Sequence, residues 1–189
     1  EKRHVIRKIL TSVVFACFVG CCFYTVTAVH AWFGQVWDPA QYQGLDATAY
    51  LETTFPEDAA AIRWLNEHVT GDPVVLEANG DSYSDYERVS AMTGLPTVLG
   101  WYVHEWLWRG DTGALNERAQ EIEAVYTSTN QEEVKKLLEK YQVRYIFVGA
   151  REREKYAALN ESMLQSLGNI VFSDEQSQTY VLQVAFSGQ

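Results

Sequence analysis

The segment from Trp101 to Gly110 (WYVHEWLWRG) concentrates aromatic side chains that could bind a flat ligand. Five of the eight side chains from Trp101 to Trp108 are Trp, Tyr or His, and glycines on both sides predict a loop. Aromatic faces suit sugar rings and isoprenoid or acyl chains, and an arginine can hold a phosphate or carboxylate through two hydrogen bonds. The candidate binding residues are Trp101, His104, Glu105, Trp108 and Arg109. A loop that covers a core edge, or that rests on a bilayer with its tryptophans among the headgroups, fits the same residues.

A second group of polar side chains directly follows a short predicted strand at 74–77. Ligand-binding loops of α/β sheets occur at such positions, where carboxylates act as general acids or bases or bind hydroxyls. The candidates there are Glu77, Tyr83, Tyr86 and Arg88. The alternative is a solvated acidic loop in which Arg88 neutralises a neighbouring carboxylate.

Other chemical motifs are missing from the sequence. His68 and His104 have no further ligand at metal-binding spacing, Ser82 and Ser90 lack a nucleophile-elbow context, and there is no glycine-rich phosphate loop. We therefore expect no metal, no cofactor and no catalytic residue in this chain. Residues 38–189 carry 11 Lys and Arg against 24 Asp and Glu, which argues against nucleic acid as a partner.

The elements that must position these residues begin with an apolar segment of 21 residues, Ile9 to Val29. A helix of that length spans about 30 Å, the thickness of a bilayer's hydrocarbon layer. Four basic residues precede it, which predicts a cytoplasmic flank at 1–8, a transmembrane helix at 9–31 and an extracytoplasmic C-terminal part at the cell membrane. A cleaved signal peptide ending near Ala31 is the rival interpretation. A start without methionine suggests a piece of a longer chain.

Residues 32–55 are interpreted as an interfacial segment and linker, and residues 56–189 as an α/β domain. Helical spacing predicts helices at 56–69, 115–126, 131–141 and 150–167, and strands are expected at 74–77, 96–100, 143–149, 169–173 and 179–185. The last two strands should form an antiparallel hairpin. Together these elements predict a mixed sheet of about five strands with helices on both faces.

Four stretches together resemble the YYY-type membrane proteins: PEDAAAIRWLNEHV, VVLEANGDSYSDYERVSAMTGLPTVLGWYVHEWLWRG, LLEKYQVRYIFVGAREREKY and TYVLQV. Those proteins are polytopic and similar in their membrane part to GT-C glycosyltransferases, which use lipid-linked sugar donors. The matching positions include the nine candidates above and Gly94, Pro96, Gly100, Tyr141, Tyr145, Gly149, Glu152, Arg153 and Tyr156.

The resemblance implies that this chain is the C-terminal end of such a protein. Its partners would be the membrane, the remaining transmembrane helices of the parent protein, and a lipid-linked sugar or glycan. The resemblance also places the catalytic acid in an early extracytoplasmic loop that this chain lacks, so the fragment alone should be inactive. A non-catalytic scaffold or binding module is the alternative, and a free-standing hydrolase using Glu77 and Glu105 is a third.

Overall fold

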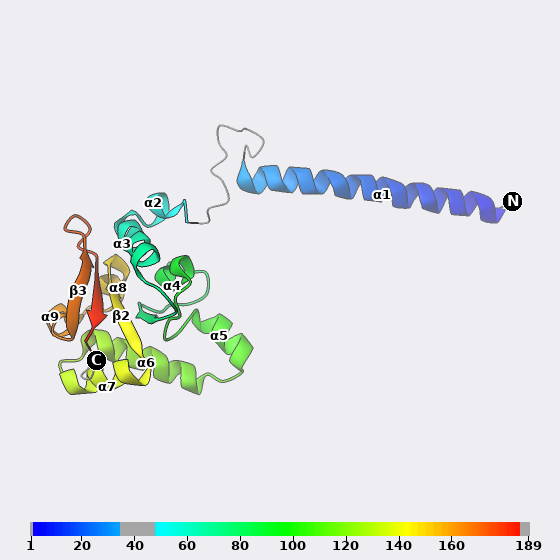
Figure 1. Ribbon diagram of the computed structural model, residues 1–189. Coiled ribbons are helices and arrows are strands. Elements are labelled where there is room, and N and C mark those ends of the chain that lie inside the picture. Colours follow the sequence, from blue (N-terminus) through cyan, green and yellow to red (C-terminus); the bar gives the residue numbers. More distant parts are fainter. Residues whose placement is uncertain (1, 35–47, 186–189) are drawn as a thin grey trace. The chain divides into compact units, whose positions relative to one another are not determined.

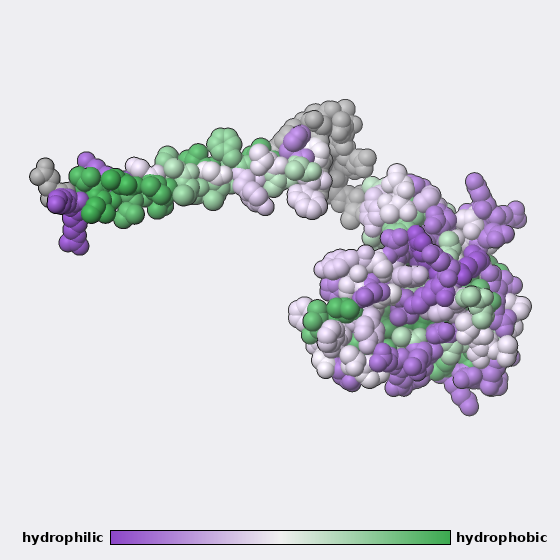
Figure 2. All heavy atoms as spheres, turned by 180° about the vertical axis from the view of Figure 1, so that it is seen from behind, coloured by the Kyte–Doolittle hydropathy of each residue, from purple (hydrophilic) through white to green (hydrophobic). Residues whose placement is uncertain are grey.

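The computed structural model describes residues 2–34 and 48–185, and it divides the chain into two units, Glu1–Ala49 and Tyr50–Gln189. Helix α1 (Lys2–Phe33) has 32 residues and belongs to the first unit. Among the described residues it is the helix long and apolar enough to cross a membrane, judged by length and composition. Hydrophobic side chains cover its surface, with hydrophilic residues at its N-terminal end (Figure 2). It contains the predicted transmembrane range 9–31.

The second unit is a mixed α/β domain, which confirms the predicted fold class (Figure 1). Its described strands form a four-stranded sheet of order β1-β2-β4-β3: β1 (Val74–Leu76), β2 (Val143–Val148), β3 (Gly168–Ser173) and β4 (Tyr180–Val184). Strands β1 and β2 pair in parallel, whereas β4 is antiparallel to both β2 and β3. The predicted terminal hairpin is therefore confirmed.

The sheet has one strand fewer than expected in the described part of the chain, because 96–100 does not form a regular strand. Thr97 makes a single parallel bridge with Val75, and the Val75 N–H donates to the Pro96 carbonyl at 2.9 Å. Pro96 has no N–H of its own, so it cannot extend the ladder from that position.

Helices cover both faces of the sheet. They are α2 (Leu51–Thr54), α3 (Pro56–His68), α4 (Arg88–Thr93), α5 (Tyr102–Arg109), α6 (Gly113–Thr127), α7 (Gln131–Lys140), α8 (Ala150–Lys155) and α9 (Glu161–Gln165). Side chains of β2 alternate between two buried clusters of the described residues. Ile146 joins the cluster with α6, α7 and α9, and Phe147 joins the cluster with α2, α3 and α4. Leu51 and Phe55, which precede the predicted start of the domain, are buried in the second cluster.

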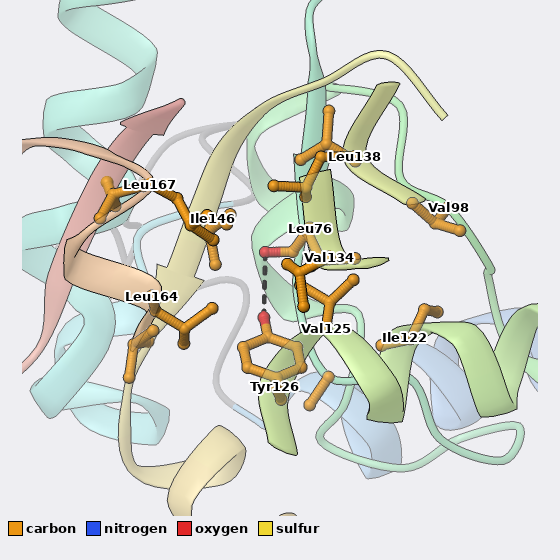
Figure 3. Close-up of a cluster of buried hydrophobic side chains, with 14 of the residues drawn as sticks. Leu76, Val98, Ile122, Val125, Tyr126, Val134, Leu138, Ile146, Leu164 and Leu167 are labelled. Atoms are coloured by element: carbon orange, nitrogen blue, oxygen red, sulfur yellow. Dashed lines mark hydrogen bonds between the residues drawn. The ribbon is translucent and has the colours of Figure 1, made fainter. Parts of the chain in front are cut away.

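Tyr126 on α6 connects the two parallel strands from the centre of the first cluster (Figure 3). Its side chain is fully buried, and its hydroxyl lies 2.9 Å from the Phe147 carbonyl and 3.2 Å from the Leu76 carbonyl. The hydroxyl can donate to only one of these carbonyls at a time. The contact holds the carboxyl ends of β1 and β2 together. The first of the predicted site residues, Glu77, directly follows β1 at this end.

Two local predictions are wrong. The segment from Trp101 to Gly110 contains the helix α5 and is not a loop; Glu105 and Arg109 pair along the helix at a spacing of four residues, and Gly110 ends it at φ 69°. The predicted helix 150–167 is divided into α8 and α9. Tyr156 leaves the helical path to stack on Tyr126 in the core at 4.8 Å, and the Asn160 side chain caps α9 by accepting from the Met163 N–H.

Candidate functional site

A buried ionic cluster lies at the carboxyl ends of β1 and β2. Arg88 on α4 donates to Asp58 on α3 through Nε, and its Nη2 lies 3.0 Å from Glu152 Oε2 on α8. All three side chains are at most 2% exposed. Glu152 also accepts from the Ala78 and Gly149 N–H groups, at 3.0 and 2.9 Å. One guanidinium therefore joins three helices and the ends of two strands.

Charge pairing explains the ionisation of this cluster. Burial alone would raise the pKa of Glu152, but the charge and hydrogen bond of Arg88, with the two backbone N–H donors, lower it below its ordinary value. Burial would lower the pKa of Arg88, and the two carboxylates instead raise it. Burial raises the pKa of Asp58 despite its contact with Arg88. The guanidinium is thus the fixed positive charge around which the carboxylates are arranged.

Gly149 lies against this cluster, at a position where a side chain would not fit. A Cβ at Gly149 would lie 2.5 Å from Asp58 Oδ1 and 3.2 Å from Arg88 Nη2. A glycine at this position therefore allows the chain after β2 to pass the buried ion pair.

Glu77 follows β1 and is 1% exposed. Its two carboxylate oxygens accept from the Val89 and Ser90 N–H groups, both at 2.7 Å, so the side chain caps the N-terminus of α4. Burial raises the pKa of Glu77 to about 7, although these donors and Arg88 oppose the shift. Glu77 and Arg88 lie in the interior and position α4.

An open groove of about 640 Å³ lies beside this cluster, along α4, residues 95–97 and α5. Five of the nine predicted binding residues line it: Trp101, His104, Glu105, Trp108 and Arg109. Trp108 is 87% exposed, and Arg109 donates to Glu105 through Nε. The structure therefore places aromatic faces and one pair of opposite charges on a single groove wall.

Two further predicted residues, Tyr83 and Tyr86, contact the start of α5 from the preceding loop. The Tyr83 ring contacts the rings of Trp101 and His104 at centroid distances of 5.5 and 5.2 Å, and it is itself 83% exposed. The Tyr86 carbonyl accepts from the Trp101 indole N–H at 3.1 Å. The two polar clusters of the sequence thus meet: Glu77 and Arg88 are buried at the start of α4, and Trp101, His104 and Trp108 line the groove.

Sequence reasoning missed three polar residues that line this groove: Glu87, Ser90 and Thr97. Glu87 starts α4 with a left-handed backbone (φ 58°) and is 5% exposed. A glutamate at an N-cap position, where Ser, Thr, Asp or Asn is usual, was the available signal. The described residues contain no group of three His, Cys, Asp or Glu side chains arranged for a metal ion.

A scan against protein-family models and a search of curated proteins find no match. Among solved structures, one similar chain is the C-terminal globular domain of an oligosaccharyltransferase from Archaeoglobus fulgidus. The two are 13% identical with a TM-score of 0.43, over 68% of this chain and 97% of that domain. A similarity of this size does not decide what the present chain binds.

The buried glutamates predict how stability depends on pH. Burial raises the pKa of Glu77 to about 7 and that of Glu87 to about 8, from an ordinary value near 4.5. Between the ordinary pKa and the raised pKa of each glutamate, the folded state therefore binds more protons than the unfolded state. The free energy of unfolding should fall as pH rises from about 5 to 8. Each glutamate contributes a slope of about 1.4 kcal/mol per pH unit within its window.

Urea unfolding at pH 5.5 and pH 8.5 measures this slope. The variant Glu87→Gln keeps an oxygen for the Gly80 N–H but cannot ionise, so its stability should fall less between the two values. At pH 8.5 it should be more stable than the wild type. A wild-type domain that gains stability from pH 5.5 to pH 8.5 would contradict the raised pKa of Glu77 and Glu87.

Proposed function

We propose that the groove along α4 and α5 binds the sugar or phosphate part of a lipid-linked sugar, or a glycan acceptor, in a parent membrane protein that resembles GT-C glycosyltransferases. The observation that carries this proposal is one groove of about 640 Å³ lined by Trp101, His104 and the largely exposed Trp108, together with the Glu105–Arg109 pair. Aromatic walls with a few polar groups are typical of binding sites for flat, partly apolar ligands.

The groove residues divide into two roles in this proposal. Trp101, His104 and Trp108 offer ring faces for stacking, and Trp108 does so without being needed for folding because it is 87% exposed. Arg109 is half exposed, with 52% of its side chain accessible, and offers its remaining guanidinium donors to a phosphate. Glu77 and Arg88 act as positioning residues because their side chains are buried and paired.

The chain itself supplies no catalytic residue in this proposal, and transfer would use groups from the rest of the parent protein. Helix α1 would hold the domain at the extracytoplasmic face of the cell membrane, since basic residues lie at its N-terminal end.

Binding to the 189-residue chain in phosphatidylcholine nanodiscs tests the proposal, because glycoside detergents would compete for the groove. The probes are a panel of neutral oligosaccharides and, separately, farnesyl phosphate. We expect Arg109→Ala to weaken farnesyl phosphate binding about tenfold, since a charge-assisted contact is lost, and to change neutral oligosaccharide binding less than about threefold.

Lys136→Ala is the matched control, because it removes the same charge from an exposed position on α7. Equal effects of the two variants would point to general charge attraction. Failure of the wild-type chain to bind either class of probe would contradict the proposed function.

A second candidate function is docking of α5 on the bilayer surface as part of a non-catalytic scaffold. Trp106, Leu107 and Trp108 are 44%, 68% and 87% exposed, and a hydrophobic patch marks the edge of the domain where α5 lies (Figure 2). Tryptophan is favoured at headgroup depth. Shielding of α5 by nanodisc lipid without any oligosaccharide binding would favour this function.

A further inference from the structure

Two buried polar atoms without a hydrogen-bond partner belong to residues that line the groove. Among the described residues, four buried side-chain atoms have no hydrogen-bond partner: Glu87 Oε2, Thr97 Oγ1, Arg151 Nε and Tyr180 OH. Glu87 and Thr97 both belong to the residues that line the groove, Glu87 at the start of α4 and Thr97 in the segment 95–97. A buried polar atom without a partner costs about 1–3 kcal/mol, so two such atoms in residues of one groove point to a ligand that supplies the missing bonds.

The conformation of Glu87 adds a second observation. Its backbone is left-handed (φ 58°, ψ 21°), which is costly for a residue with a side chain. Its Oε1 accepts from the Gly80 N–H at 2.5 Å, while Oε2 is left without a partner. The loop therefore holds one carboxyl oxygen in place and leaves the other for a further contact.

We propose that Glu87 and Thr97 form a hydroxyl-binding subsite in the groove, which takes an uncharged sugar ring. The ring hydroxyls would donate to and accept from Glu87 Oε2 and Thr97 Oγ1 while one ring face lies toward the aromatic residues of α5. This subsite rests on the proposed glycan-binding function of the groove and specifies which part of the ligand lies where.

The surrounding charges favour an uncharged ligand at this subsite. Burial raises the pKa of Glu87 to about 8, the neighbouring Glu77 adds to the shift, and Lys155, Arg88 and the Gly80 N–H oppose it. A protonated carboxyl can donate one hydrogen bond and accept another, as a sugar hydroxyl requires. The charged residues of α5 that line the groove are Glu105 and Arg109, which pair with each other. Arg109 is the cation of this pair, so a phosphate would bind at its end of the groove.

Thr97 gives the cleaner test, because its hydroxyl makes no hydrogen bond in the structure. Thr97→Val keeps the shape and removes the unpartnered hydroxyl, so it should not lower the urea midpoint, yet it should weaken binding of the tightest neutral oligosaccharide by about fivefold or more. Thr97→Ser keeps the hydroxyl and should bind within about twofold of the wild type. Unchanged affinity of Thr97→Val, or an equal loss in Thr97→Ser, would overturn the subsite.

Glu87 is tested by a second pair of variants at pH 7. Glu87→Gln retains a donor at the outer position and should bind within about threefold, whereas Glu87→Met removes both polar atoms and should bind at least about tenfold more weakly. Equal binding of Glu87→Met and the wild type would overturn the subsite. If the wild type binds an oligosaccharide and the Thr97 and Glu87 variants bind it equally well, the groove binds glycans but the subsite is wrong. If the wild type binds no probe, the proposed function of the groove is wrong.

Discussion

Replacing Arg88 with alanine is expected to lower the free energy of unfolding of the domain by about 3–5 kcal/mol. The change leaves Asp58 and Glu152 in the interior without the cation that both contact, at 0% exposure each. The loss is a large share of the roughly 5–15 kcal/mol that stabilises a domain. Urea unfolding followed by tryptophan fluorescence measures it.

Arg63→Ala provides the matched control, because Arg63 pairs with Glu52 on the surface, where both side chains are more than half exposed. Its removal should cost less than about 1 kcal/mol. The triple variant Arg88→Met, Asp58→Asn, Glu152→Gln should recover part of the loss, since it leaves no buried charge unpaired. If Arg88→Ala costs no more than Arg63→Ala, the cluster does not hold the domain together.

Replacing Trp108 with alanine is expected to weaken binding of the tightest neutral oligosaccharide at least about thirtyfold, a loss of about 2 kcal/mol, without changing the stability of the domain. Trp108 lines the groove and is 87% exposed, so the folded state loses little packing when the ring is removed. A ligand stacked on the indole loses its largest apolar contact. Calorimetric titration of the chain in nanodiscs measures the effect.

Trp106 offers a matched control on the same helix. It is 44% exposed and is not among the residues that line the groove, so Trp106→Ala removes an equal ring from a different face of α5. Binding should remain within about threefold of the wild type. Equal losses in the two variants would favour a general role of α5 in docking over ligand binding in the groove.

The fold class followed from the sequence because its signals are local and strong. The segment VRYIFVG contains β2, one of the two interior strands, and the helices expected at 115–126 and 131–141 correspond to α6 and α7. The errors lie where long-range contacts override local pattern. Tyr156 stacks on Tyr126, which is 30 residues earlier, and this contact interrupts the expected helix 150–167.

The sequence indicated two separate groups of candidate residues, and their spatial relation required the structure. The aromatic segment was recognised by composition, but its helical form depends on the Glu105–Arg109 pair and on Gly110. The interior positions of Glu77 and Arg88 could not be read from type alone, since exposed loops carry the same residues. Glu87 escaped notice because its importance lies in a left-handed backbone and an unpartnered oxygen.

The most direct test of the glycan-binding groove follows the six tryptophan indole N–H signals by nuclear magnetic resonance, with the chain in phosphocholine micelles. Titration with the bound neutral oligosaccharide should shift the signals of Trp101 and Trp108, which line the groove, and leave Trp64 on α3 unchanged. A titration in which the oligosaccharide binds but the signals of Trp101 and Trp108 stay fixed would contradict the account.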